Sequence, residues 1–155
     1  MIEVLEICDL DVKDVAELSF EVGKLHDEAL PKYFNKTNKK EHLRIIECMR
    51  KDENAKILVA KDGEKVVGFI CLGVAEDKRK GYKVKKLGEV YNLGVEESYR
   101  KKGVGKLLME KGEEYFEEKG CEAIDLNVFW FNQNALAFLE SLGFEKIDVN
   151  LRKEI

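Results

Sequence analysis

A strand, a basic glycine-containing turn and an amphipathic helix follow one another between residues 88 and 120. The strand-like run Gly88–Val95 leads to the turn Arg100–Gly105, and a helix is expected from about Val104 to Lys119. Its apolar residues recur on one face, and Gly120 suits a left-handed helix end. An amphipathic helix that follows a strand needs a sheet to cover, so we expect a layered fold of helices on a sheet.

The turn has the composition of an anion site. Gly103 and Gly105 lack a Cβ atom, so their backbone can approach a bulky anion, and the helix start adds unpaired N–H groups. The same residues also describe an ordinary turn before a solvated helix. A nucleoside-triphosphate P-loop is excluded, because Arg100 stands where that motif needs glycine and Leu107 where it needs Ser or Thr.

The remaining pattern predicts an α/β (α+β) fold with the order β-α-α-β-β-β-α-β-α-β, a mixed, mostly antiparallel central sheet flanked by helices. Asp62-Gly63 between two apolar runs indicates a hairpin. We expect one domain over residues 1–155. The other predicted elements are strands 2–8, 57–60, 66–72, 123–129 and 144–151, and helices after residue 9 or 11, over 39–51 and over 135–142.

Composition narrows the functional classes. The net charge of −4 argues against a general nucleic-acid binder, although the basic run Lys78–Lys86 leaves salt-sensitive RNA binding as a third hypothesis. The chain has no apolar run long enough to span a membrane and no signal-like start, which predicts a cytoplasmic protein. No Cys/His cluster suggests a metal site. The four cysteines are expected to be reduced and mostly buried.

Two separate motifs resemble the GNAT superfamily of N-acetyltransferases. The first is Arg100-x-x-Gly103-x-Gly105, preceded by Leu93-x-Val95 and followed by a helix. The second is Asn132-x-x-Ala135 leading to Leu142-Gly143-Phe144. The resemblance covers essentially the whole chain and implies the fold, acetyl-CoA as cofactor and a primary amine of a small molecule or peptide as acceptor.

The same resemblance assigns cofactor contacts. It implies that a bent strand holds the pantetheine arm through backbone groups and that the turn holds the pyrophosphate. Gly94 suits a bend, because glycine weakens a strand. By position, the cofactor-binding residues are Leu93, Gly94, Val95, Arg100, Lys101, Lys102, Gly103, Val104, Gly105, Lys106 and Asn132.

Catalytic residues are harder to assign. Glu89, eleven residues before Arg100, stands where a branch of the family carries its glutamate base, but it also fits a solvent-facing strand residue. Strand alternation places Glu89 on one face with Tyr91, Leu93 and Val95. The position of the family's tyrosine acid is occupied by Leu139, so Tyr91, water or no acid at all would serve the departing thiolate.

Three further possibilities stay open. Without the usual acid, the chain could be a catalytically weak acyl-CoA-binding sensor or regulatory module. The helical region after the first strand, with His26, Tyr33 and Phe34, and the run Phe129–Phe131 are candidate acceptor-site walls that equally suit packing. The predicted last strand 144–151 could pair across a homodimer.

Overall fold

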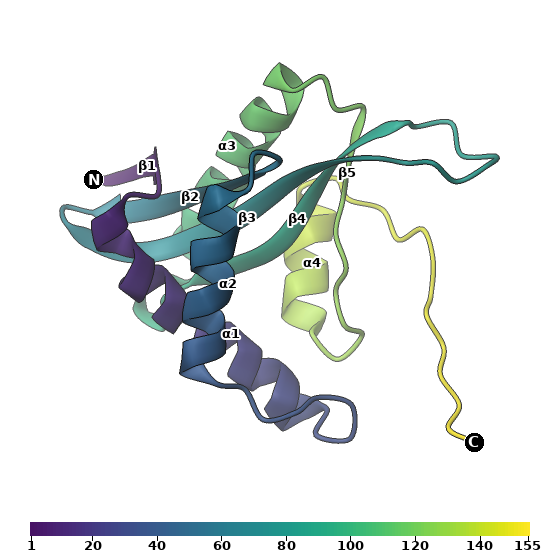
Figure 1. Cartoon of the computed structure of the whole chain (residues 1–155), viewed down its shortest axis with the longest axis horizontal. Coiled ribbons are helices and arrows are strands. Elements are labelled where there is room, and N and C mark those ends of the chain that lie inside the picture. The colour runs from purple at the N-terminus through teal and green to yellow at the C-terminus, as the bar shows by residue number, and fades with distance from the viewer.

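In the computed structural model, which describes residues 1–155, a five-stranded sheet has two helices on each face (Figure 1). Helices α1 and α2 cover one face, and α3 and α4 cover the other. The elements are β1 (Ile2–Glu6), α1 (Val12–Ala29), α2 (Lys39–Lys51), β2 (Ala55–Asp62), β3 (Lys65–Glu76), β4 (Lys86–Val95), α3 (Val104–Glu118), β5 (Ala123–Asp125) and α4 (Gln133–Ser141). None of the helices combines the length and apolar character needed to cross a lipid bilayer.

The strands follow one another in the sheet in chain order, β1-β2-β3-β4-β5. The first four pair antiparallel and β5 pairs parallel to β4, which confirms a mixed, mostly antiparallel sheet. The expected hairpin joins β2 and β3, with Asp62 opposite Lys65 and Gly63 at φ +60°. A positive φ costs glycine little, so the turn is encoded locally.

Strand β3 is buried on both faces, which explains its unbroken apolar sequence. Phe69 and Cys71 pack against α1 and α2, whereas Ile70 and Leu72 pack against α3. Both faces of the sheet therefore carry a core. Strand β4 pairs with β3 along its whole length, but with β5 only at residues 87–89.

The predicted last strand is wrong. Residues 144–155 form no ladder, and Ile147, Val149 and Leu151 are 74%, 76% and 88% exposed. Strand β5 is also shorter than the predicted 123–129, since its pairing stops at Asp125. Alternating apolar residues make a segment suitable for a strand, but a strand forms only where a neighbour offers free backbone groups at the right distance.

The cysteines also differ from expectation. Cys71 is buried, but Cys8 and Cys48 are exposed and Cys121 is half-buried; all four are free. Burial raises the pKa of the Cys71 thiol to about 12. The thiolate that covalent catalysis would need is therefore strongly disfavoured at the only cysteine in the sheet.

Helices α1 and α2 are joined by polar contacts as well as by apolar packing. Asn38 caps α2 through its Oδ1 atom, which accepts from the Lys40 N–H at 2.8 Å. Ser19 of α1 is 3% exposed, and its Oγ lies 2.8 Å from Nδ1 of His42. Burial lowers the pKa of His42 from its ordinary 6.5, against a weaker opposing attraction from Glu41.

This lowered pKa predicts how stability depends on pH. Because unfolded His42 takes up a proton more readily than the folded residue, its contribution to stability is complete above the unfolded pKa and is lost as the pH falls through the folded pKa. We expect the free energy of unfolding to decrease on acidification below about pH 6.5. Urea unfolding measured at several pH values should show this slope in the wild type and in His26→Asn, but a reduced slope in His42→Asn.

Candidate functional site

The turn between β4 and α3 is shaped by two residues with positive φ. Lys101 has φ +59° and is the only non-glycine residue in the chain with positive φ, and Gly103 has φ +85°. The Arg100 side chain folds back on the strand, where its Nε donates to the carbonyl of Val95 at 3.0 Å. Alternation of left- and right-handed backbone in such a turn directs successive N–H groups into one concavity.

These N–H groups have no partner within the chain. From Lys101 to Lys106, none of the six consecutive backbone N–H groups donates to a protein acceptor; the first bond of the helix runs from Leu107 N–H to the Gly103 carbonyl at 3.0 Å. No side chain caps α3. Six free donors, the positive end of the helix dipole and the exposed Lys101, Lys102 and Lys106 give this helix start the features that favour an extended anion, and we refer to it below as the anion site.

Other predicted cofactor residues have packing roles of their own. A Cβ on Gly105 would lie 3.3 Å from Cζ of Phe138, so this glycine also lets α3 approach α4. Val104 is buried, and only its backbone can face a ligand. Asn132 caps α4 by accepting from the Ala135 N–H at 3.2 Å. The second motif thus has a structural role as well as a possible binding role.

One edge of β4 opens beside the anion site. The parallel ladder of β4 with β5 runs from Leu87↔Ala123 to Glu89↔Asp125 and then stops, so residues 90–95 have no strand partner on that side. In Figure 1, the chain beyond β5 runs away from β4 towards α4. The free edge therefore leads from the end of the ladder to the turn before α3.

An extra residue in β4 alters which way its side chains point. Cys71 pairs with Asn92 and Leu72 pairs with Val90, which leaves Tyr91 as a β-bulge. Tyr91 stays on the α1–α2 face with Glu89, but Leu93 and Val95 pack with the core on the α3 side. The expectation that all four share one face is wrong, because a bulge resets the two-residue alternation of a strand.

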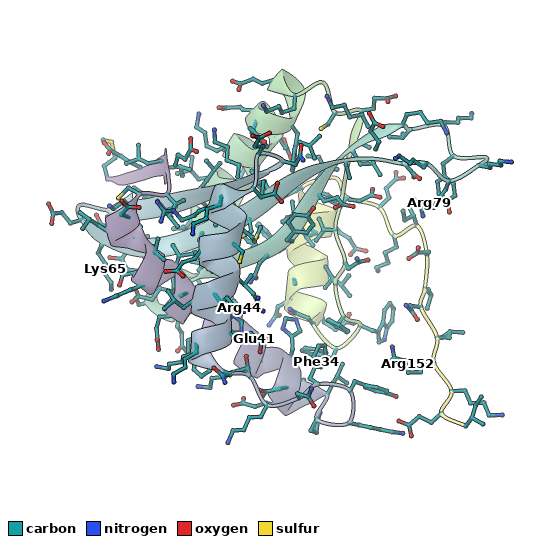
Figure 2. The ribbon with its side chains drawn as sticks, viewed as in Figure 1. Phe34, Glu41, Arg44, Lys65, Arg79 and Arg152 are labelled. Atoms are coloured by element: carbon teal, nitrogen blue, oxygen red, sulfur yellow. The ribbon has the colours of Figure 1, made fainter.

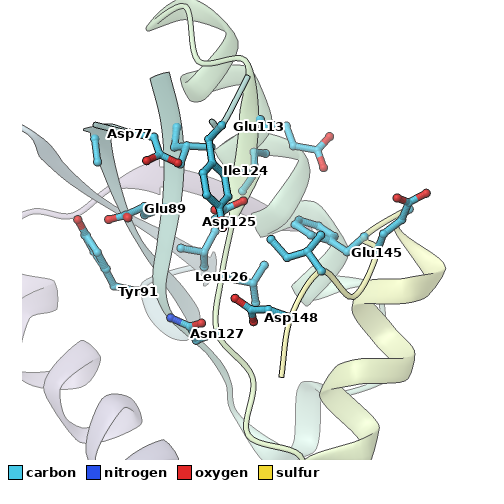
Figure 3. Close-up of a pocket in the computed structure, with 18 of the residues that line it drawn as sticks. Asp77, Glu89, Tyr91, Glu113, Ile124, Asp125, Leu126, Asn127, Glu145 and Asp148 are labelled. Atoms are coloured by element: carbon cyan, nitrogen blue, oxygen red, sulfur yellow. The ribbon is translucent and has the colours of Figure 1, made fainter. Parts of the chain in front are cut away.

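A cleft of about 950 Å³ surrounds the point where the β4–β5 ladder ends. Its walls come from the β3–β4 connection, from strands β4 and β5, and from the segment after α4 (Figure 3). Glu89 and Tyr91 project to the same side of β4 in this view. The lining contains one basic residue, Arg79, and the acidic residues Glu76, Asp77, Glu89, Glu113, Asp125, Glu145 and Asp148.

Neighbouring groups shift the pKa values of two residues in the cleft. Arg79 donates from Nη2 to Asp77 at 2.6 Å, and these bonds lower the pKa of the Asp77 carboxyl to about 2. Burial raises the pKa of the Tyr91 hydroxyl, and the nearby Glu89 carboxylate raises it further. Asp77 is therefore a permanent anion, and Tyr91 keeps its proton near neutral pH.

Asp125 is a cleft residue that the sequence did not single out. It lies directly opposite Glu89 in the last pair of the β4–β5 ladder. The strand pattern of 123–129 contained this carboxylate, but nothing local indicated that pairing would stop there. Leu139, by contrast, is 6% exposed within the core of the α3 side and offers no proton donor.

The candidate acceptor walls do come together. His26 of α1 lies 5.8 Å from Phe34 and 5.3 Å from Phe129, measured between ring centroids, and Phe34 lies 5.0 Å from Phe129. Phe131 joins the same group at 5.8 Å from His26. Figure 2 shows Phe34 near the α1–α2 loop, well away from Arg79 on the β3–β4 connection. The aromatic cluster joins the α1–α2 loop to the segment before α4.

A mixed sheet in which β4 has an open edge and leads into a helix start with free N–H groups is an arrangement found in α/β proteins, in which helix N-termini and strand ends are common places for phosphate-bearing ligands. The chain belongs to the GNAT family of acetyltransferases, whose family model matches residues 21–144.

Relatives of known sequence agree with this membership. The chain is 36% identical over 98 residues to a mycothiol acetyltransferase of Propionibacterium freudenreichii, covering 63% of this chain and 30% of that protein. It is 28% identical over 142 residues to an uncharacterized N-acetyltransferase of Methanocaldococcus jannaschii, covering 90% and 58%. The chain thus spans less than two thirds of either relative.

Solved structures share the fold over nearly all of the chain. The BH1408 protein of Bacillus halodurans superposes with a TM-score of 0.91 at 23% identity, covering 99% of each chain. An aminoglycoside N-acetyltransferase, AAC(6')-Iy, solved in complex with CoA, superposes with a TM-score of 0.79 at 16% identity, covering 100% of this chain and 95% of its own.

The role of the turn can be tested with a matched pair of glycines. Gly103 and Gly120 both have positive φ, +85° and +72°, and a Cβ at either would meet nothing within 4 Å. Alanine at each should cost about 1 kcal/mol of stability through backbone strain. Only Gly103→Ala reorients the free N–H groups, so we expect its dissociation constant for CoA to rise about tenfold, the value of one charge-assisted hydrogen bond.

Isothermal titration of CoA into both variants checks this expectation. Equal weakening in Gly103→Ala and Gly120→Ala would show that strain alone, and not the shape of the turn, controls binding.

Proposed function

We propose that this protein is an N-acetyltransferase that moves the acetyl group of acetyl-CoA to a primary amine of a small molecule or peptide. The observation that carries the proposal is that the free edge of β4 joins the anion site to the end of the β4–β5 ladder. A cofactor held by its pyrophosphate at the start of α3 and extended along this edge would bring its thioester to Glu89 and Asp125.

The cofactor contacts follow from that placement. The N–H groups from Lys101 to Lys106 would bind the pyrophosphate, with Arg100 shaping the turn from behind. Backbone groups of Leu93, Gly94 and Val95 would pair with the amides of the pantetheine arm, since that edge of β4 has no strand partner. Asn132, at the start of α4, would border the cofactor from the opposite side.

Transfer requires a neutral amine. Glu89 would accept a proton from the ammonium group directly or through water, and the amine nitrogen would then attack the thioester carbonyl. A backbone N–H of the bulged strand would stabilise the oxyanion. The C–S bond then breaks, the thiolate leaves, and the nitrogen releases its second proton to water to give the neutral amide. Tyr91 would give its hydroxyl proton to this sulfur and regain one from water, since buried Leu139 has no proton to give.

The charge of the cleft supports an amine acceptor. Seven carboxylates and one arginine line it, and Arg79 is already bound to Asp77. A cationic substrate would be concentrated there by the negative potential, whereas an acidic one would be repelled. The lining thus favours an acceptor whose reacting amine arrives protonated, as the need for a base also implies.

We expect Glu89→Gln to lower kcat/KM about 100-fold or more at neutral pH, because general base catalysis contributes factors of that size. Asp125→Asn, at the opposite position of the ladder, is the matched control and should lose less activity. The measurement is amine-dependent release of free thiol from acetyl-CoA across a panel of amines, with CoA affinity determined for each variant.

The outcomes separate the alternatives. A larger loss in Asp125→Asn would move the role of base to Asp125. Tight CoA binding by the wild type without turnover on any amine would favour an acyl-CoA-binding sensor or regulatory module, the function that buried Leu139 leaves open.

We also propose that the chain forms a homodimer through its last residues. The outer edge of β5 has no partner, and the exposed Ile147, Val149 and Leu151 alternate as a strand would. A second copy could pair this segment with β5 and remove both unpaired edges. Sedimentation equilibrium should give a dimer for the wild type and a monomer for Val149→Lys; a monomeric wild type at all concentrations would refute the proposal.

A further inference from the structure

A chain of hydrogen bonds crosses the α1–α2 side of the molecule and ends at the bulge of β4. Asn92 Nδ2 donates to Ser19 Oγ at 3.2 Å, and Ser19 Oγ lies 2.8 Å from His42 Nδ1. His42 Nε2 lies 2.8 Å from Thr37 Oγ1, and the Thr37 N–H donates to Asp27 Oδ2 at 2.6 Å. The chain therefore joins β4, α1, α2 and the loop between the two helices.

The direction of the two bonds of His42 depends on its tautomer. In one neutral tautomer Ser19 donates to Nδ1 and Nε2–H donates to Thr37; in the other, Nδ1–H donates to Ser19 and the Thr37 hydroxyl donates to Nε2. Either tautomer of the neutral imidazole makes both hydrogen bonds, and in both Ser19 accepts from Asn92.

The packing around these hydrogen-bonded side chains depends on a glycine and on a buried polar residue in α1. A Cβ on Gly23 would lie 2.8 Å from Thr37 Oγ1 and 2.9 Å from His42 Nε2, so glycine in the middle of α1 is what admits the two side chains. Ser19 is buried beside an otherwise apolar layer that includes Val15 and Phe69. Apolar residues would fill that layer with less desolvation, so polar groups there fix a particular geometry more than they add stability.

The hydrogen bonds begin at the open edge of β4 and reach the loop that contributes to the aromatic cluster. Asn92 follows Tyr91 in the bulge and lies within the free edge of β4, residues 90–95. At the other end, Thr37 belongs to the loop that carries Phe34, whose ring packs on Phe129. The hydrogen bonds thus connect the open edge of β4 to the loop that carries Phe34.

We propose that Asn92, Ser19, His42 and Thr37 are positioning residues that hold the bulge of β4 in the geometry needed for acetyl transfer and couple it to the α1–α2 loop. This inference rests on the proposed acetyltransferase function. None of the four side chains has to touch the reacting atoms. They act through the backbone at Tyr91 and Asn92, which sets the direction of the Glu89 and Tyr91 side chains and of the bulge N–H that would stabilise the oxyanion.

Thr37 provides the sharpest test, because of the four proposed positioning residues it is the one farthest along the hydrogen bonds from β4. Thr37→Val keeps the shape and removes the hydroxyl, whereas Thr37→Ser keeps the hydroxyl. We expect kcat of Thr37→Val to fall about tenfold and that of Asn92→Leu about 100-fold, since small displacements at a reacting centre cost factors of this size. Thr37→Ser should retain wild-type kcat, and CoA affinity should change less than about twofold in all variants.

A control and a second readout keep this inference separate from the proposed function. Ser141→Ala deletes a hydroxyl that bonds only to the Phe138 carbonyl within α4, and should leave kcat unchanged. Amide NMR spectra report the bulge without any turnover: Thr37→Val should shift the Tyr91 and Asn92 amide signals, and Ser141→Ala should not.

Absence of wild-type turnover with every amine would sink the proposed function and with it this inference. An active wild type in which Thr37→Val and Asn92→Leu keep full kcat, or lose it only in proportion to unfolded protein, would overturn the positioning role alone. Unshifted bulge signals in Thr37→Val would overturn the coupling.

Discussion

The early end of the parallel ladder between β4 and β5 is the constraint on which the site depends. Pairing stops at Glu89↔Asp125, and the free edge of β4 then runs for six residues to the turn before α3. Backbone donors and acceptors on that edge have to be satisfied by water or by a ligand with amide groups. The opening between the strands thus sets where the proposed cofactor would lie and which of its groups β4 could bind.

This opening survives because the other edge of β4 is strongly held. Strand β3 pairs with β4 along nearly its whole length and is itself buried between two helical layers. The bulge at Tyr91 adds local twist without breaking that ladder. Rigidity on one side of β4 and free backbone on the other let the strand present a fixed row of polar groups, which is what a preorganised binding site requires.

Much of this could be predicted from local sequence. The helix at 39–51, the hairpin at Asp62-Gly63 and the turn from Arg100 to Gly105 all follow from residues close in the chain, whose backbone preferences do not need the fold. The anion site could be predicted for the same reason, since the free N–H groups and the glycine belong to one short segment. Even so, Gly105 has a contact with Phe138 that no local pattern indicates.

The sequence by itself determined most of the helices and strands and the glycine-containing turn before α3, because these depend on chain neighbours. Only the tertiary structure decided that β4 bulges at Tyr91, that Asp125 lies opposite Glu89 and that residues 144–155 stay unpaired. Each of these depends on the register in which two strands pair or on where their pairing ends. Strand pairing joins residues far apart in the chain, and its register and end are set by the packing of whole layers rather than by the preferences of any one segment.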